Sequence, residues 1–548
     1  MHSAGGVGAL FSIFDVSLVE NVVFFSGGFG AKYGDALSGI LDVKTRNGSK
    51  TNYSGNMLCS LAGFNLRIEG PIIKNNTSFI LTGRKNYSAL ILKQQGRADD
   101  YEVFPYYWDF SGKIAQKINK YNSFEFFYFK GTDSMVYKIR RSDYQGNLAW
   151  SSDQEIMNFR YISFINSKWY SELSISKNLF NNEYELTNST WSKNKLSQYY
   201  LRWDQTIRAH PRHKIETGLE VKNQKLYSSG YYPENEYEWT TPDYSWMIYQ
   251  SKVLGTKFGA YFQDQIELGN NLFSTVGARG DYFDKIQAST ADLRVSLAYA
   301  PDSSTILKAS TGTYHQFPYL EYLMEINGNS KLKPMLAYHF CIGVEKKLKF
   351  GLSTNLELYY KKYKNLILKN EKQYYSNQGY GQGKGIELLI QKSGGFFSGW
   401  LSYSYSLSRR KELDFPEVLP ANYDIPHNLT LNCLIKLPRN FELGAKYRFA
   451  SGRPYAPVIG ADYNPEKNVY YPKYGEKQSK RYPDYMRLDL RLSKALFLKK
   501  LAVFIFFELG NAFNHKNIIK YNYSEDYSTK TPFTLMDRLY FIGLIVLF

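Results

Sequence analysis

The sequence predicts an all-β protein, a transmembrane antiparallel β-barrel of about 22 strands. Aromatic residues make up 17% of the chain, with 49 Tyr and 36 Phe, yet the mean hydropathy is only −0.42. Polar and apolar residues alternate in many segments. No apolar run approaches the roughly 20 residues that a transmembrane helix needs, whereas a barrel strand needs only about 9–11 residues that are apolar on one face.

Strict alternation recurs along the part of the chain expected to form the barrel, residues 51–548. Residues 64–69 and 487–492 each set three apolar side chains against three polar or charged ones, and residues 401–408 alternate Leu or Tyr with Ser. Period two places these sets on opposite faces of a strand. We therefore expect the apolar set to face lipid; in residues 401–408 this set is Leu401, Tyr403, Tyr405 and Leu407. The serines between them, Ser402, Ser404 and Ser406, are expected to face the lumen.

The connections between the expected strands alternate between short and long. Short polar turns are expected at residues 70–76, 119–122 and 209–214. Long aromatic connections are expected at residues 88–107, 223–256, 452–482 and 515–535. Short turns on one rim and long loops on the other are typical of transmembrane barrels. A barrel of about 22 strands leaves roughly 23 residues for each strand with its connection.

The last expected strand carries a signature of its own. Counting back by twos from the C-terminus gives only apolar or aromatic residues: Phe548, Val546, Leu544, Ile542 and Tyr540. This alternation with a terminal Phe resembles the C-terminal strand of outer-membrane barrels, which their assembly machinery recognises. The resemblance implies an integral barrel in the outer membrane of a diderm bacterium, with outer-membrane lipid and the barrel-assembly machinery as partners.

A glycine-rich stretch near the N-terminus is the most informative motif. Val19-Glu20 precedes a run that ends at Lys44-Thr45 and contains Gly27, Gly28, Tyr33, Gly34, Ser38 and Gly39. Two short strands that turn tightly inside a barrel need positions with positive φ and no side chain. The stretch resembles the end of the plug domain of TonB-dependent receptors. An ordinary Gly-rich hairpin is the alternative.

Further segments resemble the receptors of this family that are common in Bacteroidetes. The resemblance runs from residue 9 to residue 548, and its segments follow one another in the order typical of the family. They are residues 68–71, 312–318, 384–387, 423–429, 451–455, 482–489 and 511–514. The resemblance assigns residues 1–50 to the C-terminal remnant of a plug domain and residues 51–548 to the barrel.

The start of the chain departs from the family pattern. Residues 1–6 have no basic region, long apolar core or cleavage site of a signal peptide. The resemblance implies a signal peptide, a TonB box and most of a plug upstream, so we expect Met1 to be an internal residue of a longer protein. TonB would then act only through the missing N-terminal segment. The chain alone should lack energy coupling and form a leaky, water-filled pore.

The family resemblance implies uptake of a scarce small nutrient. A ferric chelate is favoured because the barrel is shorter than in the large glycan importers, with cobalamin and oligosaccharide as alternatives. A surface lipoprotein is a further candidate partner. A second hypothesis places the chain in a different functional class. It would be a non-energised outer-membrane pore or a ligand-binding surface protein instead of an importer.

Aromatic and acidic residues gather between residues 227 and 249. Aromatic side chains provide contact area at low entropic cost and suit flat or sugar-like ligands. The candidate ligand residues are Tyr231, Tyr232, Tyr237, Trp239, Tyr244 and Trp246. An aromatic girdle with ordinary loop packing explains the same residues without a ligand.

The remaining composition argues against other classes. The formal charge of +18 is scattered rather than gathered into a recognition element, so no nucleic-acid partner is expected. His210 and His213 lie in a short turn without an evident carboxylate or Cys partner, and three distant cysteines form no ligand pattern, so no metal site is expected. The sequence shows no catalytic constellation and no phosphate-binding loop. We therefore expect that the protein is not an enzyme and binds no cofactor.

Overall fold

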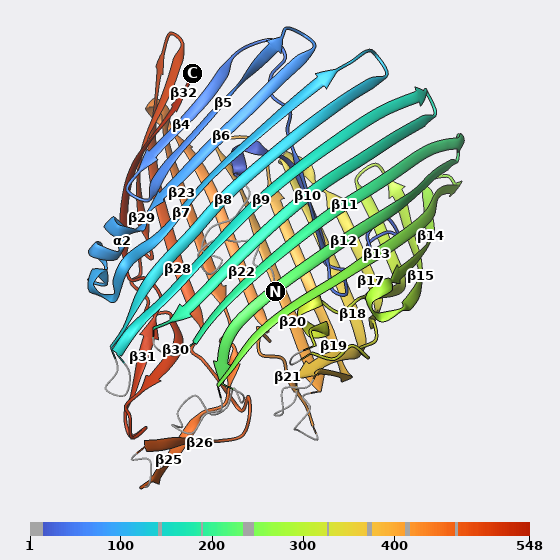
Figure 1. Cartoon of the computed structure of the whole chain (residues 1–548). Helices are drawn as coiled ribbons and strands as arrows, with labels where there is room; N and C mark the ends of the chain where they lie inside the picture. Colours follow the sequence, from blue (N-terminus) through green and yellow to red (C-terminus); the bar gives the residue numbers. More distant parts are fainter. Residues whose placement is uncertain are drawn as a thin grey trace.

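The computed structural model describes residues 15–140, 145–187, 190–233, 246–325, 328–369, 375–411, 417–465 and 469–548. It shows one closed barrel of 22 antiparallel strands (Figure 1). Neighbouring strands follow the order of the chain, and the last strand, β32, returns to pair with the first, β4. This confirms the predicted fold class.

The barrel strands differ in length, and the longest lie in the first half of the chain. They begin with β4 (Ser54–Ser60), β5 (Gly63–Ile73), β6 (Thr77–Tyr87), β7 (Tyr101–Lys117), β8 (Asn122–Arg140), β9 (Gln145–Asn166), β10 (Trp169–Leu186), β11 (Thr190–His210), β12 (His213–Pro233), β13 (Trp246–Gly269) and β14 (Leu272–Phe283). They continue with β15 (Ala288–Asp302), β16 (Thr305–Gln316), β17 (Met335–Lys347), β18 (Leu352–Lys369), β19 (Tyr375–Lys392), β20 (Phe397–Lys411), β22 (His427–Leu437), β23 (Phe441–Ala450), β28 (Tyr485–Leu498), β29 (Leu501–Gly510) and β32 (Leu539–Leu547).

Smaller elements lie in the long connections. A short strand, β21 (Val418–Pro420), pairs with β20, and a seven-residue helix, α2 (Ser88–Gln94), precedes β7. Three hairpin-like sheets are β24 (Pro454–Tyr455) with β27 (Lys480–Arg481), β25 (Val458–Asn464) with β26 (Val469–Tyr474), and β30 (Ile518–Tyr523) with β31 (Lys530–Thr534). In the part of the chain that the structure describes, no helix is both long enough and apolar enough to cross a membrane.

Strand register fixes which side chains face the lumen. The side chain of Lys361 binds an N-terminal segment inside the barrel, and its cross-strand partners are Gly383 and then Ser408. Cross-strand partners share a face. Ser402, Ser404 and Ser406 therefore face the lumen with Ser408, and Leu401, Tyr403, Tyr405 and Leu407 face outward. This confirms the predicted orientation of β20.

The two rims differ as expected. Tight turns follow β5, β7, β11 and β13, and Asn75 and Asn271 adopt positive φ angles of 64° in two of them, which asparagine tolerates well. The long connections lie on the opposite rim, where β25 and β26 project furthest (Figure 1). One expectation was wrong: residues 223–256 are mostly strand, because β12 extends to Pro233 and β13 begins at Trp246.

The C-terminal residue takes part in closing the barrel. The backbone N–H of Phe548 donates to the carbonyl of Gly55 at 3.1 Å, and the N–H of Gly55 donates back at 2.8 Å. Tyr540, Ile542 and Phe548 are each about half exposed on the outer face, and Leu544 and Val546 share their alternation along β32. The predicted C-terminal alternation is therefore present in the strand that forms the seam.

Candidate functional site: a hairpin held in the lumen

Residues 15–46 form a hairpin inside the barrel. A short 3-10 turn (Val16–Leu18) leads into β2 (Val19–Phe25), which pairs with β3 (Ile40–Thr45) in a sheet separate from the barrel. The glycine-rich loop between them, residues 26–39, contacts inward-facing side chains of the wall. This loop contains every residue of the predicted plug motif. We call it the hairpin loop.

Three wall arginines bind four consecutive backbone carbonyls of the hairpin loop. Arg294 on β15 donates to the carbonyls of Gly30 and Tyr33 at 2.6 and 2.5 Å. Arg279 on β14 donates to Ala31 at 3.4 Å, and Arg202 on β11 donates to Lys32 at 3.0 Å. Guanidinium groups carry several donors in a fixed plane. They therefore satisfy a non-helical stretch of backbone that no sheet covers.

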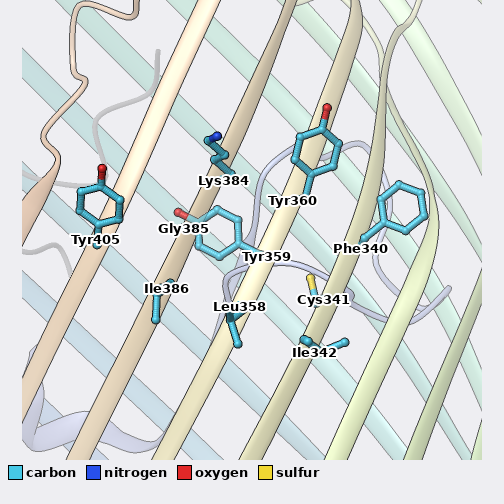
Figure 2. Close-up of a pocket in the computed structure, with 10 residues that line it drawn as sticks. All are labelled: Phe340, Cys341, Ile342, Leu358, Tyr359, Tyr360, Lys384, Gly385, Ile386 and Tyr405. Atoms are coloured by element: carbon cyan, nitrogen blue, oxygen red, sulfur yellow. The ribbon is translucent and has the colours of Figure 1, made fainter.

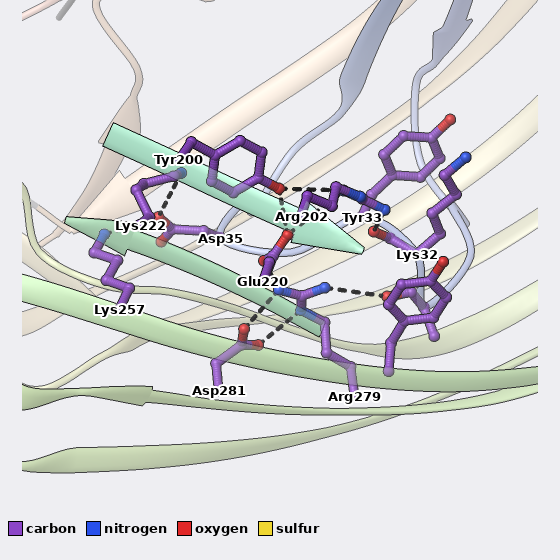
Figure 3. Close-up of polar contacts among 12 residues, drawn as sticks. Lys32, Tyr33, Asp35, Tyr200, Arg202, Glu220, Lys222, Lys257, Arg279 and Asp281 are labelled. Carbon is purple, nitrogen blue, oxygen red and sulfur yellow. Dashed lines mark hydrogen bonds and ion pairs between the residues drawn. The ribbon is translucent and has the colours of Figure 1, made fainter. Parts of the chain in front are cut away.

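Carboxylates of the wall hold these arginines in place (Figure 3). Arg279 has a fully buried side chain and pairs with Asp281 at 2.6 Å and with Glu220. Arg202 pairs with Asp204 at 2.7 Å and with Glu220 at 3.5 Å. A buried charge is tolerated only when it is paired and hydrogen-bonded. The network therefore orients the arginines toward the hairpin loop without the help of a ligand.

Asp35 supplies a charge from the loop itself. Its carboxylate lies 2.8 Å from the Lys257 ammonium and 3.9 Å from that of Lys222 (Figure 3). It also accepts the backbone N–H of Phe317 at 2.9 Å. Burial acts to raise the pKa of Asp35, but the two lysines outweigh it and hold that pKa below its ordinary value. The carboxylate is thus ionised at physiological pH and fastens the loop to β12 and β13.

The other end of the hairpin loop is held by a histidine and a lysine. The backbone N–H of Gly28 donates to Nδ1 of His339 at 3.4 Å. Because Nδ1 is the acceptor, Nε2 of His339 carries the hydrogen and donates to the carbonyl of Leu37 at 2.8 Å. Lys361 donates to the carbonyls of Ser38, at 2.8 Å, and Ser26. His339 on β17 and Lys361 on β18 thereby join the two ends of the loop across the wall.

Apolar packing completes the attachment. Phe29 is fully buried against Tyr314 on β16, with ring centroids 4.5 Å apart. The guanidinium of Arg294 lies 4.3 Å from the Tyr314 ring centroid and 5.1 Å from that of Phe29. Cation–π contacts of this kind stabilise the arrangement by roughly 1–2 kcal/mol when desolvated.

The glycines of the motif are explained mainly by close approach to the wall. Only Gly28, with φ of 63°, has the positive φ that was predicted for such positions. A Cβ on Gly34 would lie 2.1 Å from Nε of Arg279, and one on Gly27 would lie 3.0 Å from Sγ of Cys341. A Cβ on Gly39 would lie 2.6 Å from the carbonyl oxygen of Phe25. The prediction of positive φ at these glycines therefore overstated the turn geometry.

The open end of the hairpin is fixed to the first barrel strands. Arg46 forms a bidentate pair with Glu69 on β5 at 2.6 and 2.7 Å. Lys113 on β7 donates to the carbonyl of Thr45 at 3.0 Å, and Asn47 donates to Glu125 on β8 at 2.9 Å. The hairpin is thus attached to the barrel wall at both ends.

One face of the hairpin remains open to the lumen. Phe24 is 65% exposed, Leu41 57% and Val22 51%. Large apolar side chains are seldom left in water when a neighbouring element can cover them. Within the described residues, nothing covers this face.

The predicted ligand loop falls largely outside the described part of the chain. Tyr237, Trp239 and Tyr244 lie in residues 234–245, which the structure does not describe. Tyr231 and Tyr232 lie at the end of β12, and Trp246 pairs with Pro233 at the start of β13. These residues therefore approach one another along the long-loop rim, and their role in ligand binding stays a prediction.

An aromatic cluster on the long-loop rim was missed by the sequence argument. Tyr455 stacks on Tyr482 with centroids 4.3 Å apart, and Tyr521 stacks on Tyr482 at 5.5 Å. Arg453 lies 5.3 Å from the Tyr482 ring and Lys530 4.1 Å from the Tyr521 ring. Burial raises the pKa of both Tyr455 and Tyr482, so the phenols stay neutral and the cluster carries positive charge.

The histidines are occupied by other partners. His213 Nδ1 lies 2.7 Å from Asp264, a carboxylate partner that the sequence argument did not foresee, and His315 Nδ1 lies 2.7 Å from Asp292. Over the described ranges, no group of three His, Cys, Asp or Glu residues is arranged to hold a metal ion. Cys59, Cys341 and Cys433 are free thiols.

The fold and the lumen hairpin define a class of protein, a wide outer-membrane barrel with a segment fixed inside it. The chain belongs to the TonB dependent receptor-like, beta-barrel family, whose pattern matches residues 76–505. This is a family of outer-membrane receptors and transporters, which bind small ligands and interact with TonB. No curated protein matches the sequence.

Several solved structures share the fold. The chain is similar to the ferric citrate transporter FecA in its unliganded form, with 15% identity and a TM-score of 0.74 over 100% of this chain and 86% of that one. It is similar to the FrpB iron transporter from Neisseria meningitidis, with 13% identity and a TM-score of 0.73 over 97% and 88%. It is also similar to the siderophore receptor PirA from Acinetobacter baumannii, with 13% identity and a TM-score of 0.72 over 97% of this chain and 85% of that one.

Proposed function

We propose that this chain forms the barrel and the end of the plug of an outer-membrane importer for an anionic ferric chelate. The observation that carries the proposal is the hairpin loop, whose backbone carbonyls are bound by cations of the lumen wall. Such an attachment suits a lumen segment that must stay in place while a ligand is held outside it. The names of the similar structures, a ferric citrate transporter and a siderophore receptor, support the ligand class.

The aromatic cluster of Tyr455, Tyr482 and Tyr521 is the proposed contact for the chelate. Its rings offer flat surfaces, and Arg453 and Lys530 supply two positive charges beside them. Ferric chelates with carboxylate or catecholate groups are anionic, and catecholate rings present flat faces, so the charges and the rings of the cluster suit them. Tyr231 and Tyr232 at the end of β12 and Trp246 at the start of β13 are proposed as a second contact. Tyr237, Trp239 and Tyr244, which lie outside the described residues, belong to the same proposal.

Alanine replacement of both Tyr455 and Tyr482 is expected to weaken binding of ferric citrate about 30-fold, because each of the two rings contributes on the order of 1 kcal/mol. Binding would be followed by quenching of tryptophan fluorescence, with cobalamin and a maltooligosaccharide as competing probes. Tyr474→Ala is the matched control, because Tyr474 is 63% exposed in the same connection. Unchanged affinity in the double variant, or tighter binding of either competitor, would contradict the proposal.

A non-energised pore is the second candidate function, and the exposed apolar face of the hairpin favours it. If nothing else covers Val22, Phe24 and Leu41, the lumen beside them contains water. The chain as given, reconstituted in a planar bilayer, is expected to show large and steady conductance. Adding an upstream plug segment in cis should then close the channel. A barrel of these 548 residues that conducts no ions would rule out the pore.

A further inference from the structure

The outer wall of the barrel carries a groove between β17 and β20. It has a volume of about 450 Å³, and its floor is formed by outward-facing residues of four adjacent strands: Ile342, Leu358, Ile386 and Tyr405. Strand register places these four residues in one row across the sheet, because each is the cross-strand partner of the next. The row faces away from the lumen, since Cys341 and Lys361 on the same strands face inward.

The groove changes character along its length. The next row toward the long-loop rim contains Phe340, Tyr360 and Lys384, followed by a row with Lys362 and Arg409. Figure 2 shows Lys384 and Tyr360 at one end of the groove and Ile342, Leu358 and Ile386 toward the other. One end therefore suits hydrocarbon and the other suits a charged group.

The cationic end lies at the level of the outer leaflet. The tight turn after β19 follows Lys392, so Ile386 is nearer the short-turn rim than Lys384. Short turns are periplasmic in outer-membrane barrels, and the apolar band is about 25 Å tall. With strands tilted by about 45°, ten residues span that band, which places Lys362 and Arg409 near its outer border.

Three exposed cations lie at this end of the groove. Lys362, Lys384 and Arg409 are exposed, and among the described residues none of them pairs with a carboxylate. Three other outward lysines, Lys177, Lys225 and Lys252, each lie over a tyrosine ring, at 5.9, 4.5 and 5.8 Å. Unpaired cations beside an apolar groove at a membrane border indicate an anionic amphiphile.

We propose that this groove binds a phosphorylated outer-leaflet glycolipid of the lipid A type. One acyl chain would lie along Ile342, Leu358 and Ile386, and phosphate groups would be held by Lys384, Lys362 and Arg409. The cations are spread over three strands, about 4.8 Å apart each, which is wider than one phosphate and suits a headgroup with two. This site is separate from the proposed chelate site and does not depend on it.

The test is native mass spectrometry of the full chain in detergent, titrated with lipid A. The variant K362Q/K384Q/R409Q is expected to lower affinity on the order of 100-fold, because each charge near an anionic lipid contributes roughly a factor of five. The matched control, K177Q/K225Q/K252Q, removes three outward charges elsewhere and is expected to keep the affinity of the unmodified protein. Heat-modifiable electrophoretic mobility would show that each variant is folded.

A second variant separates the groove from the charges. Ile386→Trp fills the floor without changing charge and is expected to weaken lipid A binding as well. Dephosphorylated lipid A should bind the unmodified protein as weakly as lipid A binds the triple variant. Equal losses in the two triple variants, undiminished binding by Ile386→Trp, or equal affinity for dephosphorylated lipid A or phosphatidylglycerol would overturn the proposal.

Discussion

Replacing Asp35 with alanine is expected to expose the thiol of Cys341, with a labelling rate on the order of 100-fold higher than in the unmodified protein. Cys341 faces the lumen and is only 7% exposed, because the hairpin loop covers it at Gly27. Labelling by a water-soluble reagent therefore requires the loop to leave the wall. The chain thus contains its own reporter of loop release.

The expected increase in labelling rate follows from the charges that remain once Asp35 is removed. Without Asp35, the ammonium groups of Lys257 and Lys222 would lose their carboxylate in a site that is mostly buried. Removing one member of a buried ion pair typically destabilises by about 3 kcal/mol, which corresponds to a factor of about 100 in the population of the open state. The backbone N–H of Phe317 would also lose its acceptor.

Glu20→Ala is the matched control for this experiment. Glu20 pairs with Lys44 at 3.2 Å on the same hairpin, but both side chains are about half exposed. Exposed pairs contribute less than about 1 kcal/mol, so the labelling rate should change less than about five-fold. Equal protection of Cys341 in the Asp35 variant and in the unmodified protein would show that the ion pair does not hold the loop.

The barrel could be predicted from the sequence because the alternation of polar and apolar residues is a local pattern. Alternation in residues 64–69, 401–408 and 487–492 marks β5, β20 and β28, since a strand with lipid outside and water inside must alternate at period two. The same rule failed at residues 223–256, where dense aromatic residues suggested a loop. There the ladder of β12 and β13 continues beyond the membrane, because backbone pairing needs no lipid.

The attachment of the hairpin could not be predicted in the same way. The glycine motif pointed to a segment packed inside a barrel, but the residues that bind it come from strands far along the chain. Arg294 is 264 residues from Gly30, and Lys361 is 323 residues from Ser38. Each is one of many lumen-facing charges, and nothing local distinguishes it. Only the closure of the barrel brings these cations to one stretch of backbone.

Deleting Phe548 is expected to reduce the amount of folded barrel in the outer membrane at least several-fold. The seam between β32 and β4 contains five paired positions, from Gly543–Ser60 to Leu547–Asn56, and the two hydrogen bonds between Phe548 and Gly55 extend it. Their loss would leave backbone groups unpaired at the seam, and each such group costs several kcal/mol where lipid replaces water. A strand that cannot close the barrel leaves an open edge.

Two further variants separate the backbone of Phe548 from its ring. Phe548→Ala keeps both hydrogen bonds but removes a half-exposed ring that lies beside Gly55, so it should give an intermediate yield if the ring is recognised during assembly. Phe497→Ala removes a ring that is 68% exposed on β28, away from the seam, and should not change the yield. The measurement is heat-modifiable barrel in isolated outer membranes. A normal yield from the Phe548 deletion would show that neither closure nor recognition needs the last residue, because the remaining seam would then suffice to exclude lipid from the edge of β4.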